Sequence, residues 1–166
     1  MSFDIAVVIS VLALAATVYQ LYLQRVHNEK SVKPLGQIDL IDFDRKISIY
    51  IVNNGLGPLI LERMIFSKDG QTYTRIDDCL ALDSKSYSRI HVSEKVKRVV
   101  LPNKYLTAFE TIFSTDENEM EVEKVRAQLS SISLKVEGRD IYDNLITIER
   151  DLEWFSRHML DKSQPS

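Results

Sequence analysis

A continuous apolar segment near the start of the chain constrains the fold more than any other feature. Residues 5–23 read IAVVISVLALAATVYQLYL, and no charged side chain lies between Asp4 and Arg25. As a helix, residues 3–23 would extend over roughly 30 Å, which is the thickness of the hydrocarbon core of a bilayer. Aromatic residues, which favour the headgroup boundary, lie near both ends of the segment, at Phe3, Tyr19 and Tyr22. We therefore predict a transmembrane anchor over residues 1–24.

Two other interpretations of this segment stay open. A buried helix of a soluble protein is disfavoured because the apolar run is long and uninterrupted. A cleaved signal peptide would find small residues for cleavage at Ala13 and Ala15. However, the residues before the run include no Lys or Arg, and the run continues well past Ala15. An uncleaved anchor fits this pattern better.

Basic residues follow the apolar segment and none precede it. Arg25, Lys30 and Lys33 come just after it, with Glu29 opposing them. By the positive-inside rule, the N-terminus should lie outside the inner (plasma) membrane and the following domain in the cytoplasm. The lone Cys79 is compatible with a reducing compartment. A periplasmic domain stays open, because a short N-terminal tail offers few charges to compare.

One face of the predicted span carries small and weakly polar residues. They recur at spacings of four and three residues and so form a single stripe, made of Ala6, Ser10, Ala13, Thr17 and Gln20. Such a face lets a second helix approach closely and offers it hydrogen bonds. We therefore expect the span to self-associate or to pair with a partner span; a chance run of small residues is the alternative.

The rest of the chain has the pattern of a β domain. Residues 25–33 form a polar spacer, and Pro34 ends any helix that reaches it. From Leu35 onward apolar and polar residues alternate, which is typical of half-buried strands. The strand candidates are residues 37–41, 47–51, 59–66, 71–76, 96–101, 105–113, 132–136 and 145–148.

We predict a mainly β fold, an antiparallel β-sandwich of about 7–8 strands over residues 34–160. One short acidic helix over residues 115–129 interrupts the strands, with Ser114 and Glu117 as a capping box. Val122, Val125 and Leu129 would form its buried face. Leu152, Phe155 and Met159 would line a second short helical segment, and residues 161–166 should form a disordered tail.

Two turn motifs lie between the expected strands. The first contains Asn53, Gly55, Gly57 and Pro58, and its Asn and Gly residues tolerate positive φ angles; the second contains Asp140, Tyr142, Asp143 and Asn144. With these motifs, residues 34–155 resemble small bacterial single-span membrane proteins of unassigned role, which carry an immunoglobulin-like β-sandwich. The resemblance implies that fold. Because its motifs are turn chemistry, it implies no activity, and the acidic helix departs from a plain sandwich.

The sequence offers no catalytic constellation, cofactor loop or metal site. The pair Gly55 and Gly57 lacks the third glycine of a dinucleotide loop, and the histidines are too widely separated for metal-ligand spacing. Cys79 follows two aspartates, which raise the pKa of a thiol. We therefore expect a protein that is not an enzyme and has no cofactor. The net charge of −3 gives no reason to expect nucleic-acid binding.

Basic residues dominate the stretch from 85 to 104. A solvated surface is the default interpretation, and a docking face for an acidic partner is the functional one. The candidate patch consists of Arg89, Lys95, Lys97, Arg98 and Lys104. The alternation of Lys95 and Lys97 would place their charges on one face of a strand.

Together these features favour a non-enzymatic single-pass membrane protein whose cytoplasmic sandwich is a protein-interaction module. Its partners would be the lipid bilayer and an unidentified protein. The first alternative is a ligand-gated membrane effector, in which the sandwich binds a small anionic signal and the span oligomerises. The second is a periplasmic module for envelope assembly or adhesion.

Overall fold

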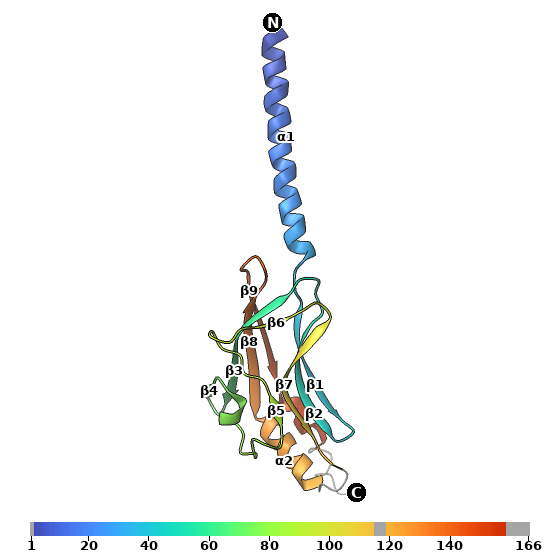
Figure 1. Cartoon of the computed structure of the whole chain (residues 1–166), viewed down its shortest axis with the longest axis vertical. Coiled ribbons are helices and arrows are strands. Elements are labelled where there is room, and N and C mark those ends of the chain that lie inside the picture. Colours follow the sequence, from blue (N-terminus) through green and yellow to red (C-terminus); the bar gives the residue numbers. More distant parts are fainter. Residues whose placement is uncertain (1, 115–118, 159–166) are drawn as a thin grey trace.

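The chain consists of one long helix followed by a mainly antiparallel β domain (Figure 1). The computed structural model describes residues 2–114 and 119–158. Helix α1 (Ser2–Ser31) continues without a break through the expected polar spacer. Its apolar window is entirely exposed, and the helix projects away from the sheets along the long axis of the molecule. By length and composition α1 is a candidate membrane span, and the same features fit a signal sequence.

The strands form two antiparallel sheets. Sheet A has the order β1 (Gly36–Phe43), β2 (Lys46–Asn53), β7 (Lys104–Ile112) and β5 (Ser88–Arg89). Sheet B has the order β4 (Gln71–Tyr73), β3 (Leu59–Lys68), β8 (Ile132–Arg139) and β9 (Leu145–Asp151), and β6 (Arg98–Val100) pairs with the start of β3. Each of the eight expected strand segments overlaps one of these strands, although β4 and β6 are shorter than the segments expected at 71–76 and 96–101. Strand β5 was not expected, because two residues are too few to show an alternating pattern.

Alternation of side chains explains how the sheets bury one face each. Along β8, buried residues alternate with half-buried ones throughout its length. Two tight turns set the register of the β1–β2 hairpin and of the β3–β4 hairpin. Asp44 and Arg45 have positive φ angles between β1 and β2, as do Asp69 and Gly70 between β3 and β4.

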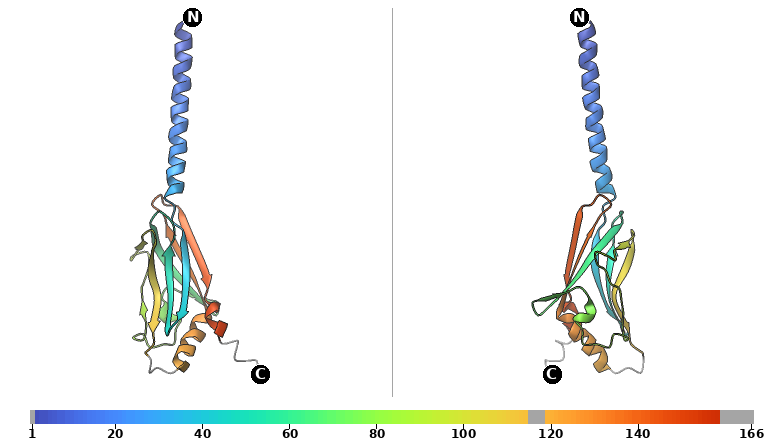
Figure 2. Two further views of the ribbon diagram at one scale, coloured as in Figure 1. Left: turned by 90° about the vertical axis from the view of Figure 1, so that its right-hand side faces the viewer. Right: turned by 60° about the vertical axis from the view of Figure 1, so that its left-hand side comes forward.

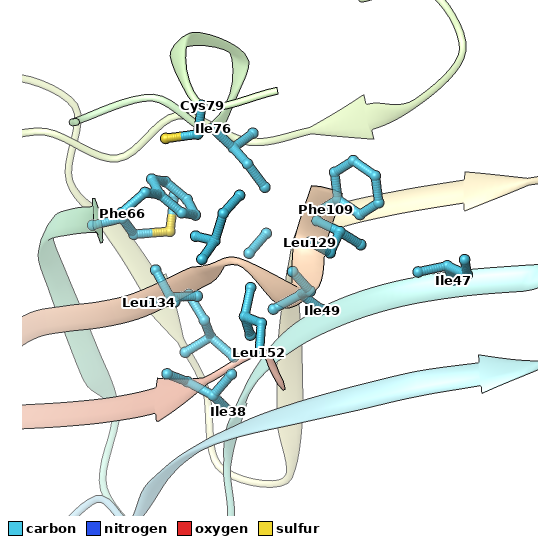
Figure 3. Packing of buried hydrophobic residues seen from close by; sticks show 14 of the residues in the cluster. Ile38, Ile47, Ile49, Phe66, Ile76, Cys79, Phe109, Leu129, Leu134 and Leu152 are labelled. Carbon is cyan, nitrogen blue, oxygen red and sulfur yellow. The ribbon is translucent and has the colours of Figure 1, made fainter. Parts of the chain in front are cut away.

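Buried side chains from both sheets form one hydrophobic core (Figure 3). Ile49 and Phe109 come from sheet A, Phe66 and Leu134 come from sheet B, and all four are almost completely buried. Leu129 reaches the same core from a helix. The core therefore extends from the sheets to the end of the domain that lies opposite α1.

Helix α2 (Glu119–Ser130) and the 3-10 segment η2 (Glu153–His158) lie together at this distal end (Figure 2). A second 3-10 segment, η1 (Ile76–Asp78), follows β4. The expected apolar face of α2, made of Val122, Val125 and Leu129, is buried. Of the C-terminal residues that we expected to pack, Leu152 and Phe155 are buried. Glu117, Met159 and the expected tail over residues 161–166 lie outside the described residues.

A buried carboxylate fastens both distal segments to sheet A. The side chain of Asp42, on β1, is only 3% exposed. It pairs with Arg126 of α2 and with Arg157 of η2. The ring of Trp154 packs against the Arg157 guanidinium, with 3.4 Å from Cζ to the ring centroid. This cluster sets the position of α2 relative to the strands.

Candidate functional site

The junction between α1 and the sheets is held by one buried side chain. Asn53, at the end of β2, accepts hydrogen bonds at Oδ1 from the amides of Leu35 and Gly55, at 3.1 and 3.0 Å. Its Nδ2 donates to the carbonyls of Gly57 and Val100, at 2.7 and 2.9 Å. All of these bonds are formed inside the protein, because Asn53 is fully buried. The chain therefore leaves α1 and enters β1 along a fixed path.

The two glycines of this motif are required for close packing. A Cβ on Gly57 would lie 1.7 Å from the carbonyl oxygen of Val32, and one on Gly55 would lie 2.3 Å from the amide of Leu35. Neither glycine has a positive φ angle. The positive φ angles that glycine tolerates are therefore not used at these two positions, where the glycines make room for the backbone that leaves α1.

The second turn motif, between β8 and β9, is organised by Asp140. Its Oδ1 accepts hydrogen bonds from the amides of Tyr142 and Asn144, and its Oδ2 accepts one from the Asn144 side chain. Burial acts to raise the pKa of the Asp140 carboxyl, but these hydrogen bonds and nearby Lys33 hold it below its usual range. At the tip of the turn, Asp143 adopts a φ of 64°.

Two residues of the small-residue stripe contribute to a shallow hollow on the exposed surface of α1. The hollow is lined by Ala6, Ser10 and neighbouring aliphatic side chains. The hydroxyl of Ser10 donates to the carbonyl of Ala6, and that of Thr17 donates to the carbonyl of Ala13, both at 2.8 Å. These hydroxyl protons are therefore used within the helix, and what the stripe offers a second helix is chiefly close approach. Gln20, the last member of the stripe, lies on the same exposed helix.

The basic residues of the candidate patch are distributed over several segments. Arg89 lies on β5, Arg98 on β6 and Lys104 on β7. Lys95 lies in a turn closed by backbone hydrogen bonds between Ser93 and Val96, and Lys97 lies between that turn and β6. The expectation that both lysines share a strand face was wrong, because this short turn breaks the strand that the alternation predicted.

Carboxylates already pair with two of these cations. Lys97 pairs with Glu62 at 2.5 Å. Arg89 pairs with Asp77, which also bonds Arg75 and the hydroxyl of Tyr87. Burial acts to raise the pKa of Asp77, but these three hydrogen-bond donors outweigh it and the pKa lies below its usual range. Burial and the hydrogen bond to Asp77 raise the pKa of Tyr87 to about 12.

The outer face of sheet A exposes apolar side chains near the distal end of the strands. Phe43 of β1 and Ile112 of β7 lie on either side of Lys46 in one cross-strand row, and they are 78% and 68% exposed. Ile41 lies one row nearer to α1 on the same face. We call Ile41, Phe43 and Ile112 the sheet A patch. This patch was not predicted, although the alternation of Ile41 and Phe43 with aspartates is visible in the sequence.

An ion pair borders the sheet A patch. Glu110 bonds Lys46 at 2.8 Å and accepts a hydrogen bond from the hydroxyl of Tyr50 at 2.6 Å. The Ser48 hydroxyl lies 3.3 Å from the same carboxylate oxygen. The hydrogen bonds from Lys46 and Tyr50 hold the pKa of Glu110 below its usual range. The rings of Tyr50 and Tyr105 lie 4.6 Å apart and extend this surface toward α1.

Reactive and metal-binding groups are sparse in the part of the chain that the structure describes. Cys79 is buried, and burial raises the pKa of its thiol to about 11. Over residues 2–114 and 119–158, no group of three or more His, Cys, Asp or Glu side chains is arranged to hold a metal ion.

Comparisons with known proteins do not assign this chain to a family. No protein-family model matches it, and neither does any curated protein. Among solved structures, the archaellum periplasmic stator protein FlaG from Sulfolobus acidocaldarius is 9% identical in sequence. That match covers 70% of this chain and 100% of the other, with a TM-score of 0.27. At this TM-score the likeness supports no conclusion about fold or function.

Proposed function

We propose that the chain is a non-enzymatic single-pass membrane protein whose β domain, an immunoglobulin-like sandwich in the cytoplasm, is a protein-interaction module. The observation that carries this proposal is the exposure of α1. Its apolar window has no contact that buries it, and water is a poor solvent for so long an apolar helix. A bilayer would cover it, and the basic residues after it favour a cytoplasmic domain.

The sheet A patch supports the interaction role. Exposed apolar groups gathered on one sheet face are typical of docking surfaces. Phe43 and Ile112 flank a Lys46–Glu110 ion pair, so the surface combines apolar anchors with a charged group that a partner protein can contact. The buried Cys79, with its raised pKa, supports a role outside nucleophilic catalysis.

A capture experiment tests this role. The full chain, tagged at Ser166 and solubilised from membranes, should retain a partner that Phe43→Ser/Ile112→Ser loses. The charge reversal Lys95→Glu/Lys97→Glu/Arg98→Glu tests the basic patch in the same way. The matched control is Thr74→Ser, on the exposed segment after β4. If the double variant and the triple variant both retain the partner, the proposal is contradicted.

A ligand-gated effector is the second candidate, and the rigid junction at Asn53 favours it. A conformational change caused by ligand binding to the domain would be transmitted to α1, because the Asn53 hydrogen bonds hold the junction in one conformation. This function predicts growth arrest or loss of membrane potential on overexpression, and no such effect when the span is scrambled. Dual reporters fused at Ser166 decide between a cytoplasmic domain and the third candidate, a periplasmic assembly or adhesion module.

A further inference from the structure

Exposed apolar side chains project from the end of the β domain that receives α1. They come from four separate connections, in contrast to the polar residues usual at loop tips. We call this set the apical tips: Leu35, Leu56, Leu101, Ile141 and Tyr142. Leu56 is 71% exposed, and Tyr142, the least exposed of the five, is 41% exposed.

Contacts show that these connections share one end of the domain. Gly57, next to Leu56, packs on the backbone of Val32. The amide of Asn103, two residues after Leu101, donates to the carbonyl of Asn53. Lys33 is close enough to Asp140 to lower the pKa of its carboxyl. Figures 1 and 2 show the β8–β9 turn beside the last turn of α1.

The length of α1 sets the height of this end above the apolar segment. From Leu23, the last residue of that segment, to Ser31 the helix rises about 12 Å. The headgroup layer on one side of a bilayer is about 5–7 Å thick, so Ser31 lies roughly 5–7 Å beyond it. The β8–β9 turn stands beside the last turn of α1, which brings its exposed side chains within reach of the headgroups. Because the Asn53 bonds fix the chain between α1 and β1, the domain stays at this height.

The charges nearest the tips favour an anionic surface. Arg25, Lys30 and Lys33 follow the apolar segment, and Lys104 begins β7 at the same end of the domain. Of the acidic groups here, Asp140 directs its carboxylate into its own turn. Glu29 pairs with Arg25, and Asp143 remains an exposed negative charge. Basic groups near a membrane are attracted by anionic headgroups.

We propose that the apical tips rest on the headgroup layer of the bilayer that α1 crosses, with anionic lipid as the partner of this surface. The inference rests on the proposed membrane anchor. Apolar and aromatic side chains would occupy the interface while the basic residues around them meet lipid phosphates. The β domain would thereby stand upright on the membrane, held by its tips as well as by its helix.

Fluorescence of single-tryptophan variants tests the proposal on the full chain. Trp154, at the distal end, is replaced by Phe, and one Trp is introduced as Leu56→Trp or Ile141→Trp. The matched control is Phe43→Trp, at the far end of β1, where the side chain is more exposed than at either tip site. Each protein is placed in vesicles of phosphatidylcholine and phosphatidylglycerol that contain a lipid with a nitroxide on its headgroup. Circular dichroism verifies that each variant is folded.

The nitroxide should remove about half of the emission from the two tip variants and leave that of Phe43→Trp nearly unchanged. Equal quenching at tip and control sites would overturn the inference, as would a blue-shifted but unquenched tip signal, which indicates a second copy of the chain. Flotation separates the two proposals. Chains that float with vesicles but show no tip quenching refute the inference alone, whereas chains that do not float refute the membrane anchor with it.

Discussion

The guanidinium of Arg126 holds the carboxylate of Asp42 by two hydrogen bonds, of 3.0 Å from Nε and 2.8 Å from Nη2. The two residues are far apart in the sequence, on α2 and β1, and they meet where the core ends. This bidentate geometry is a strong form of ion pair, and it is largely shielded from water.

Removal of one member of this pair should be costly. Asp42→Ala leaves Arg126 and Arg157 without their shared carboxylate, and we expect the free energy of unfolding to fall by about 3 kcal/mol. Urea titration followed by circular dichroism measures this loss. The control Glu29→Gln breaks only the Arg25 pair on exposed α1 and should change stability by less than about 0.5 kcal/mol. Similar losses in both variants would show that the buried pair contributes nothing special.

Asn53→Ala should loosen the entry to β1. The substitution deletes four hydrogen bonds in a buried site and should cost about 2–4 kcal/mol. Hydrogen exchange should show faster exchange of the Leu35 and Gly55 amides. Asn54→Ala is the neighbouring control, since the Asn54 side chain is exposed and donates to the side chain of Gln37. Unchanged protection at Leu35 in Asn53→Ala would refute the role assigned to this side chain.

Glu110 should make stability depend on acidity. Its pKa in the folded chain lies below the ordinary value of 4.5, so its contribution is complete above about pH 4.5 and is lost as pH falls through the lowered pKa. Thermal melts between neutral and acidic pH should show the decline, and Glu110→Gln should reduce its steepness. If the thermal stability of Glu110→Gln falls with pH as that of the parent does, the effect belongs to other carboxylates.

Cys79 should react slowly with thiol reagents. Burial raises the pKa of its thiol to about 11, so little thiolate exists at neutral pH and the sulfur is shielded. Labelling with a maleimide at neutral pH should proceed much faster in urea than in buffer. Cys79→Ala/Ser88→Cys provides an exposed thiol for comparison. Equally rapid labelling of native Cys79 and of the exposed site would contradict this description.

Ala13→Leu should weaken association between spans. The larger side chain fills the small-residue stripe and prevents close helix approach. Crosslinking in membranes should yield less dimer than in the parent chain. Leu12→Ile, on another face of the same helix, is the control. If Ala13→Leu crosslinks as the parent does, the stripe has no role in association.

Local patterns in the sequence predicted the elements of this fold well. Strong alternation identified long strands such as β2 and β8, and apolar spacing identified the buried face of α2. Strand β5 escaped because it is defined by its partner, β7, and not by a periodic pattern. The turn at Ser93–Val96 escaped for a related reason, since two alternating lysines resemble an exposed strand whatever their backbone does.

The sites were harder to predict because they depend on distant contacts. Asn53 and Gly57 were recognised as turn residues, but their packing on Val32 and Leu35 appears only when β2 folds beside the end of α1. The residues around Asp42 in the sequence give no sign of its partners, which are on α2 and η2. In the expected basic patch, Lys97 pairs with Glu62 and Arg89 pairs with Asp77. These ion pairs were not predicted, because each acidic partner lies on a different element of the chain.

The unbroken helix and its tight junction make α1 a lever. A helix of 30 residues is about 45 Å long. If α1 tilts by about 10° about its N-terminal end, the domain at its other end moves sideways by about 8 Å. Because Asn53 holds the chain where it leaves α1, a rotation of α1 about its axis would also turn both sheets through the same angle. In a pair of such chains, the crossing geometry of the helices would therefore fix which surfaces of the two domains face each other.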